Sequence, residues 1–150
     1  MAKKVNTDLI KKLLKETTHI KNNVSLIVLG INPDEMIAVI NTFRNYIEGY
    51  RVFETVISQN TLTILCDDVL ALEITNIYKK HIIDYRRGLS ALTMIHPEKA
   101  IDTPGVLAHT LKLLADANIN IIGIISCYRD ISLIIKRDDA FKAKELLEKL

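Results

Sequence analysis

An internal repeat constrains this chain more than any other feature of its sequence. Residues 33–68 match residues 104–139 without a gap, at a constant shift of 71 positions that places Pro33 on Pro104. Apolar residues recur in both segments at the i, i+4, i+7 spacing of a buried helix face. They are Met36, Ile40 and Phe43 in the first segment, and Leu107, Leu111 and Leu114 in the second. The repeat predicts two structural units of the same kind.

Both units have the same order of predicted elements: an apolar strand, an amphipathic helix, two β-rich runs and a second helix. The expected ranges are 24–29, 33–48, 51–57, 61–66 and 68–80 in the first unit, and 89–96, 104–118, 119–127, 131–136 and 138–150 in the second. With a last strand the order becomes βαββαβ, in which both helices lie on one face of a four-stranded antiparallel sheet. We therefore predict an α+β fold of two tandem ferredoxin-like units.

The same pattern predicts where the parts of the chain begin and end. The expected parts are an amino-terminal amphipathic helix at 1–22, a first unit at 23–88 and a second unit at 89–150. The helix is built on four apolar residues, Leu9, Ile10, Leu13 and Leu14. The last predicted helix of the second unit ends the chain, so its fourth strand is either missing or supplied by the first unit or by a neighbouring subunit.

The strand expected at 119–127 is apolar on both faces. Ile119, Ile121 and Ile125 point to one face, while Ile122 and Ile124 point to the other. A half-exposed antiparallel strand would alternate apolar and polar residues. Helices cover only one face of this fold, so the amino-terminal helix, the other repeat or another subunit must cover the second. We favour another subunit and expect a homodimer or a larger homo-oligomer.

The turn before the first helix of the second unit carries the most specific signal. It reads Ile101-Asp102-Thr103-Pro104-Gly105-Val106-Leu107, and the helix after it leads into Ala117-Asn118-Ile119-Asn120-Ile121. These segments, with the acidic start of the last helix, resemble the signature of the ACT domain family across residues 89–150, with a divergent, degenerate second copy at about 24–80. The resemblance implies a regulatory domain that binds a small ligand, usually an amino acid, at the interface between two such domains. The ligand contacts it implies are Asp102, Thr103, Pro104, Gly105, Val106, Leu107, Asn120, Ile121 and Ile122.

The chemistry of this turn also supports ligand binding without reference to the family. We expect Thr103 to cap the helix and Pro104 to occupy its first position, where the missing N–H is no loss. Gly105 has no side chain to hold a ligand away, and the helix amides that follow could receive a carboxylate. Asp102 and Asn120 could then contact an ammonium group. The alternative is an ordinary capped turn that binds nothing.

The matching turn of the first unit departs from this pattern. It reads Ile31-Asn32-Pro33-Asp34-Glu35, so an aspartate replaces the glycine. Asp34 and Glu35 place two negative charges at the helix start, where they suit the helix dipole but repel a carboxylate. We expect the first unit to serve as a structural partner, leaving one type of functional site per chain.

Other chemistry-bearing residues give no catalytic or metal site. The histidines at 19, 81, 96 and 109 do not share a helix face at metal-ligand spacing, although His109 lies near the proposed pocket. The acidic pairs at 67–68 and 138–139 are typical of helix starts. Cys66 and Cys127 suggest no disulfide framework and are expected as small buried residues in strands. Without a phosphate loop or a nucleophile motif we expect neither an enzyme nor a cofactor.

The net charge and the composition limit which classes of binding partner we expect. A net charge of +2 does not indicate nucleic acid, although residues 1–22 carry six lysines against Asp8 and Glu16. The amino terminus lacks a signal-peptide core and no segment approaches membrane-spanning length, so we expect a cytoplasmic protein. The leading hypothesis is a non-catalytic amino-acid sensor that acts in trans on an unidentified protein partner. The alternatives are an oligomerisation or adaptor module without a ligand, and a transcription-linked regulator that uses the basic helix.

Overall fold

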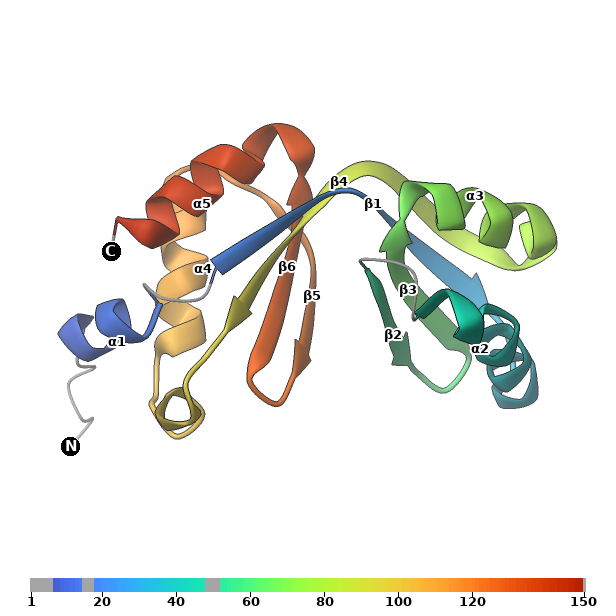
Figure 1. The fold of residues 1–150 in the computed structure, drawn as a ribbon, viewed down its shortest axis with the longest axis horizontal. Helices are drawn as coiled ribbons and strands as arrows, with labels where there is room; N and C mark the ends of the chain where they lie inside the picture. Colours follow the sequence, from blue (N-terminus) through green and yellow to red (C-terminus); the bar gives the residue numbers. More distant parts are fainter. Residues whose placement is uncertain (1–6, 15–17, 48–51, 150) are drawn as a thin grey trace. The chain divides into compact units, whose positions relative to one another are not determined.

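The computed structural model describes residues 7–14, 18–47 and 52–149 (Figure 1). The elements in chain order are α1 (Thr7–Leu14), β1 (Thr18–Gly30), α2 (Pro33–Ile47), β2 (Phe53–Ile57), β3 (Thr61–Asp67), α3 (Asp68–Ile77), η1 (Lys79–His81), β4 (Ile82–Ile95), η2 (Glu98–Ala100), α4 (Val106–Asp116), β5 (Ile121–Cys127), β6 (Asp130–Lys136), η3 (Arg137–Asp139) and α5 (Ala140–Glu148). The chain divides into two compact units. The first unit is Lys21–Leu89, and the second comprises the described residues of Met1–Ile20 and Ser90–Leu150.

The first unit is an antiparallel sheet with two helices on one face. Its strands are hydrogen-bonded in the order β2-β3-β1-β4, and the β1–β3 register pairs Ile27 with Ile64. Alternate residues of the strands point into one core because side chains along a strand have a period of two. That core contains Ile27, Leu29, Met36, Val39, Phe43, Leu62, Ile64, Cys66, Leu70, Ala71 and Ile74. Since both α2 and α3 contribute to it, the unit has the predicted ferredoxin-like arrangement.

The second unit repeats this arrangement with α4 and α5. Strands β5 and β6 pair antiparallel, with an irregularity between Ile121 and Gly123, and β6 also pairs with β4. The core under the helices contains Ile10, Leu92, Met94, Val106, Leu114, Ile119, Leu133, Ile135, Ala143 and Leu147. Helix α1 packs against α4 and buries Ile10 completely. The amino-terminal helix therefore belongs to the hydrophobic core of the second unit.

The fourth strand of the second unit comes from the beginning of β1. Thr18–Ile20 belong to the second unit, and β1 is the hydrogen-bonded neighbour of β4. The order β5-β6-β4-β1 matches the order β2-β3-β1-β4 of the first unit, position by position. The strand that closes the second unit thus follows α1 and precedes β4 in the sequence, and it continues into the first strand of the first unit.

Strand β5 is an edge strand of the second unit. Ile124 is 42% exposed, and Ile121, Ile122 and Ile125 are half-buried. The described part of the same chain therefore leaves apolar surface uncovered on this strand. Among the described residues, no helix combines the length and the apolar composition needed to span a membrane.

Candidate functional site

The second unit contains a cavity of about 300 Å³ at the end of β4. It is formed by the end of that strand, the turn that follows it, the first turn of α4 and the hairpin between β5 and β6. The residues that line it are His96, Ala100, Ile101, Thr103, Gly105, Val106, Leu107, Ala108, Tyr128 and Ile131. Since most of these side chains are apolar, the few polar groups at the cavity decide what it can bind.

The start of α4 differs from the start expected from the sequence. The helix begins at Val106, and Gly105 precedes it with a φ of 91°. The Thr103 hydroxyl does not cap the helix, because it donates to the Lys99 carbonyl oxygen at 2.6 Å. The predictions of a Thr103 cap and of Pro104 at the first helical position are therefore wrong. The left-handed conformation at Gly105, which favours glycine, delays the helix by two residues relative to the start predicted at Pro104.

Because no side chain caps α4, the backbone N–H groups of its first turn remain available to a ligand. The first main-chain hydrogen bond runs from the His109 N–H to the Gly105 carbonyl oxygen at 2.9 Å. The N–H groups of Val106, Leu107 and Ala108 precede this bond, and no side chain caps the helix. These three residues line the cavity. Because the dipole is positive at a helix N-terminus, this edge of the cavity suits an anion such as a carboxylate.

His96 is the second polar feature of the cavity. Its side chain is only 4% exposed, and within the described part of the chain neither Nδ1 nor Nε2 has a hydrogen-bond partner. Its backbone is fixed, since the His96 N–H donates to the Arg129 carbonyl oxygen at 2.9 Å and Arg129 Nε donates to the His96 carbonyl oxygen at 2.6 Å. Burial lowers the pKa of the imidazole below its ordinary value. The ring is therefore neutral at neutral pH.

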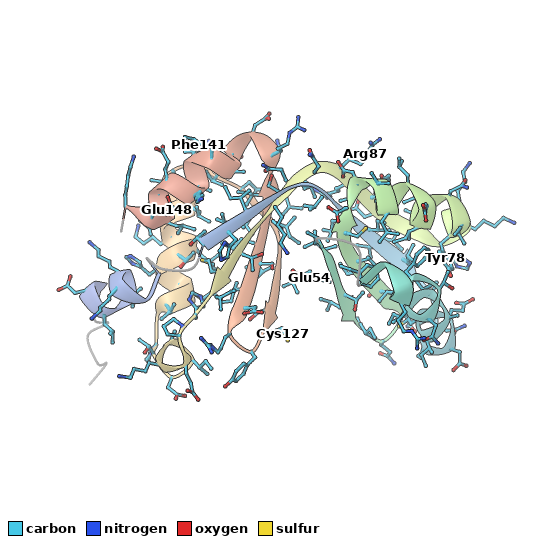
Figure 2. The ribbon with its side chains drawn as sticks, in the orientation of Figure 1. Glu54, Tyr78, Arg87, Cys127, Phe141 and Glu148 are labelled. Atoms are coloured by element: carbon cyan, nitrogen blue, oxygen red, sulfur yellow. The ribbon has the colours of Figure 1, made fainter. Side chains whose placement is uncertain are left out.

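The hairpin between β5 and β6 forms another border of the cavity. Tyr128 is 76% exposed and has a φ of 51°, which is uncommon for a residue other than glycine. Cys127, at the end of β5 (Figure 2), is exposed, so its predicted burial is wrong. Cys66 is buried as predicted, and burial together with the neighbouring Asp67 and Asp68 carboxylates raises the pKa of its thiol to about 12.

The structure brings together only some of the residues predicted to contact a ligand. Thr103, Gly105, Val106 and Leu107 line the cavity, whereas Asp102 and Pro104 lie in the same turn but outside the lining. Asn120, Ile121 and Ile122 lie at the start of β5, and the cavity lies at its other end. Tyr128 follows Ile121 by seven positions, which is roughly 23 Å along an extended strand. Asp102 lies before α4 and Asn120 lies after it, and neither lines the cavity, so their joint contact with one ligand stays a prediction.

Sequence reasoning missed several residues of the cavity. They are His96, Ala100, Ile101, Ala108, Tyr128 and Ile131. The available signal for His96 is a polar residue at the end of an apolar strand, which the spacing of histidines as metal ligands does not reveal. In the described residues no group of three or more His, Cys, Asp or Glu side chains is arranged to hold a metal ion.

The corresponding turn of the first unit is closed by its own side chains. The Glu35 N–H donates to Asn32 Oδ1 at 2.9 Å, and the Asn32 N–H donates to Glu35 Oε2 at 3.0 Å. This reciprocal pair is a capping box, which satisfies amides at the start of α2. The Glu35 carboxylate thus occupies the helix start where an external carboxylate would have to bind.

Comparison with known proteins gives one family and one group of structures. An ACT domain family model matches residues 84–149, and no curated protein matches the sequence. The regulatory subunit of aspartate kinase from Thermus thermophilus, in ligand-free form, has 19% identity and a TM-score of 0.65 over 91% of this chain and 97% of that chain. The regulatory subunit from Thermus flavus has 18% identity and a TM-score of 0.68 over 89% of this chain and 95% of that chain.

Larger aspartate kinases match over part of their length. E. coli aspartokinase III, in complex with aspartate and ADP, has 13% identity and a TM-score of 0.68 over 91% of this chain. The chain spans only 33% of that enzyme and 33% of the aspartate kinase from Clostridium acetobutylicum. Such identities show a shared fold, whereas the family match rests on the sequence. Residues 84–149 therefore match the ACT domain family, in agreement with the resemblance carried by the turn before α4 and the start of β5.

Proposed function

We propose that this protein is a non-catalytic regulatory module that binds an amino acid at the cavity beside α4. The observation that carries the proposal is the open first turn of this helix, whose uncapped amides border a cavity of about 300 Å³. A carboxylate suits these amides, and a small side chain suits the apolar lining. Regulatory subunits of aspartate kinase have a similar fold, which supports a regulatory role by analogy.

The ligand class follows from the two kinds of surface in the cavity. The helix start favours an anionic group, while Ala100, Val106 and Ile131 offer apolar contacts. An α-amino acid has both a carboxylate and a variable side chain. A matched structure of E. coli aspartokinase III is a complex with lysine and aspartate. This chain spans 32% of that protein, so the likeness supports the ligand class only as an analogy.

We further propose that the active form is a homo-oligomer. The predicted contacts Asn120, Ile121 and Ile122 lie at the far end of β5 from the cavity, so a second copy would have to supply them. The edge strand β5, with Ile124 exposed, offers a surface for that copy. Ligand bound between two ACT domains would stabilise one assembly and thereby change the activity of a separate protein partner. The first unit acts in this scheme as a divergent ACT-like partner with a closed helix start.

The test is a thermal-shift screen of the whole chain against the twenty amino acids, with its mass measured by light scattering. A ligand that binds only the native state at a hundred times its Kd stabilises it by about 2.7 kcal/mol. We expect a selective shift from one chemical class of amino acid. A flat screen with a stable oligomer would instead support an adaptor module without a ligand.

Two substitutions at one position locate the site. Gly105→Asp places a carboxylate beside the open amides and should abolish the ligand-dependent shift. Gly105→Asn is the matched control, because asparagine has nearly the same shape and tolerates a left-handed conformation but carries no charge. We expect Gly105→Asn to keep a measurable shift. If Gly105→Asp responded to the ligand as well as Gly105→Asn, the ligand would bind elsewhere.

A further inference from the structure

His96 is a buried polar side chain that the fold itself does not satisfy. Both ring nitrogens are buried from solvent, and neither has a hydrogen-bond partner among the described residues. A native fold pairs nearly all of its buried polar groups, so an exception requires an explanation. The backbone of His96 is held at the cavity by two hydrogen bonds: its N–H donates to the Arg129 carbonyl oxygen, and Arg129 Nε donates to its carbonyl oxygen. Its position is therefore a fixed feature of the cavity wall.

We propose that His96 determines the specificity of the cavity and selects amino acids whose side chain carries an uncharged hydrogen-bonding group, a hydroxyl or a carboxamide. This inference rests on the proposed function, since it assumes that an amino acid occupies the cavity. The α-carboxylate binds at the first turn of α4, and the side chain reaches the imidazole. Both groups border one small cavity, so a single small molecule contacts both.

The neutral ring explains the preference for an uncharged partner. A neutral imidazole presents one N–H donor and one acceptor nitrogen. Hydroxyl and carboxamide groups can both donate and accept, so they satisfy whichever nitrogen they meet. An aliphatic side chain of the same shape would leave the ring unpaired, and a site built to hydrogen-bond a ligand rejects the analogue that lacks the polar group.

Charged side chains fit the cavity less well. None of the residues that line it is an aspartate, glutamate, lysine or arginine. A buried ammonium group would therefore lack a countercharge, and a buried side-chain carboxylate would meet a neutral ring. The Thr103 hydroxyl already donates to the Lys99 carbonyl oxygen, and Tyr128 is mostly exposed to solvent. His96 is thus the buried polar side chain of the lining that still needs a partner.

Two pairs of ligands of equal shape test this inference. Threonine is compared with valine, and asparagine with leucine, by isothermal titration calorimetry on the unmodified protein. We expect the polar member of at least one pair to bind about tenfold more tightly or better, because an unpaired buried group is disfavoured by about 1–3 kcal/mol. The same titrations are repeated on His96→Leu and on His96→Gln.

The two variants test whether the His96 imidazole causes the preference for the polar ligand of each pair. His96→Leu removes both nitrogens and should reduce the preference to less than about threefold, while binding through the α-carboxylate persists. His96→Gln retains a donor and an acceptor and should keep the preference. The ligand-free melting temperature of His96→Leu should be equal to or higher than that of the unmodified protein, since the unpaired nitrogens are gone.

Each outcome separates this inference from the proposed function. If valine binds as tightly as threonine and leucine as tightly as asparagine, the inference is wrong, but the amino-acid site stands. If His96→Leu keeps the full preference, another group makes the selection and the inference is also wrong. If none of the twenty amino acids binds, the proposed function fails and this inference fails with it.

Discussion

The two units have aligned prolines, Pro33 and Pro104, where their first helices were expected to begin, but the two turns end in opposite ways. Helix α2 begins at Pro33, and Asn32 and Glu35 cap each other's main-chain amides. Helix α4 begins at Val106, two positions later in the repeat, without a side-chain cap. A single position explains much of this difference, because Gly105 adopts a left-handed conformation where the first unit has Asp34 in a regular helix.

The comparison contrasts a helix start that its own side chains stabilise with one that leaves its amides uncapped. A capped helix start is stabilised by its own residues and has no open amides to offer. An uncapped start forgoes that stabilisation and keeps amides for another molecule. The unpaired His96 lies at the same cavity as the open start. These two destabilising features therefore lie together at one cavity of the second unit, as expected for a site that the fold leaves incomplete.

The largest effects should come from the two hydrophobic cores. Leu62 and Leu133 occupy matching positions of the repeat, and both are fully buried. Leu62→Ala and Leu133→Ala should each lower the free energy of unfolding by about 2–5 kcal/mol. We expect only Leu133→Ala to weaken ligand binding, because Leu133 belongs to the core beneath α4. Denaturant unfolding and calorimetric titration measure the two effects.

Leu62→Met and Leu133→Met serve as controls because they nearly conserve volume and should change stability by less than about 1.5 kcal/mol. Equal loss of binding in Leu62→Ala and Leu133→Ala would mean that the site depends on both units alike. The contrast between a structural first unit and a ligand-binding second unit would then be wrong.

A smaller effect is expected from the left-handed glycine at the start of α4. Gly105→Ala should destabilise the protein by about 1–2 kcal/mol, because a side chain is disfavoured at this φ. It should also weaken ligand binding by moving the first amides of the helix. Gly88→Ala is the matched control, since Gly88 has a φ of 68° with nothing within 4 Å of an added Cβ. We expect it to lose similar stability and to bind ligand normally.

The capping box of the first unit should have a slightly smaller effect. Asn32→Ala removes the side-chain acceptor for the Glu35 N–H and should cost about 1 kcal/mol of stability. Ligand binding should not change, because this helix start is closed. Asn41→Ala, at an exposed position of the same helix, should change stability by less than about 0.5 kcal/mol. Hydrogen exchange at the start of α2 would locate the loss, and a loss spread evenly over the chain would contradict it.

The sequence predicted what depends on local periodicity and turn chemistry. The apolar stripe from Met36 to Phe43 identified α2, and the turn at Thr103–Gly105 led to the cavity. The predicted stripe of α4 identified a helix but not its buried face, because Leu107 is exposed and the buried residues are Val106, Thr110 and Leu114. The fourth strand of the second unit was beyond such reasoning, because Thr18–Ile20 lie far from β4 in the sequence and only the folded chain brings these strands together.

The sequence did not predict the backbone conformations at the site, because a residue type allows several conformations and does not fix one. Thr103 and Pro104 form a common helix start, yet the φ of Gly105 moves the start to Val106. Tyr128 gives no turn signal, although it occupies a left-handed position in the hairpin. His96 reveals its role only through burial without a partner. Packing of the whole unit determines each of these features.

The smallest effect we predict is the pH dependence of stability that His96 adds to the second unit. Burial lowers the pKa of its imidazole in the folded protein, whereas the unfolded chain has the ordinary value of about 6.5. As the pH falls below about 6.5, the unfolded chain binds a proton that the folded protein resists, so the free energy of unfolding decreases. Denaturant unfolding between pH 5 and 8 should show this decrease, and His96→Leu should show less of it because the buried imidazole is gone. If the free energy of unfolding changed with pH equally in the unmodified protein and in His96→Leu, burial would not hold His96 neutral. The buried imidazole would then no longer distinguish the second unit from the first.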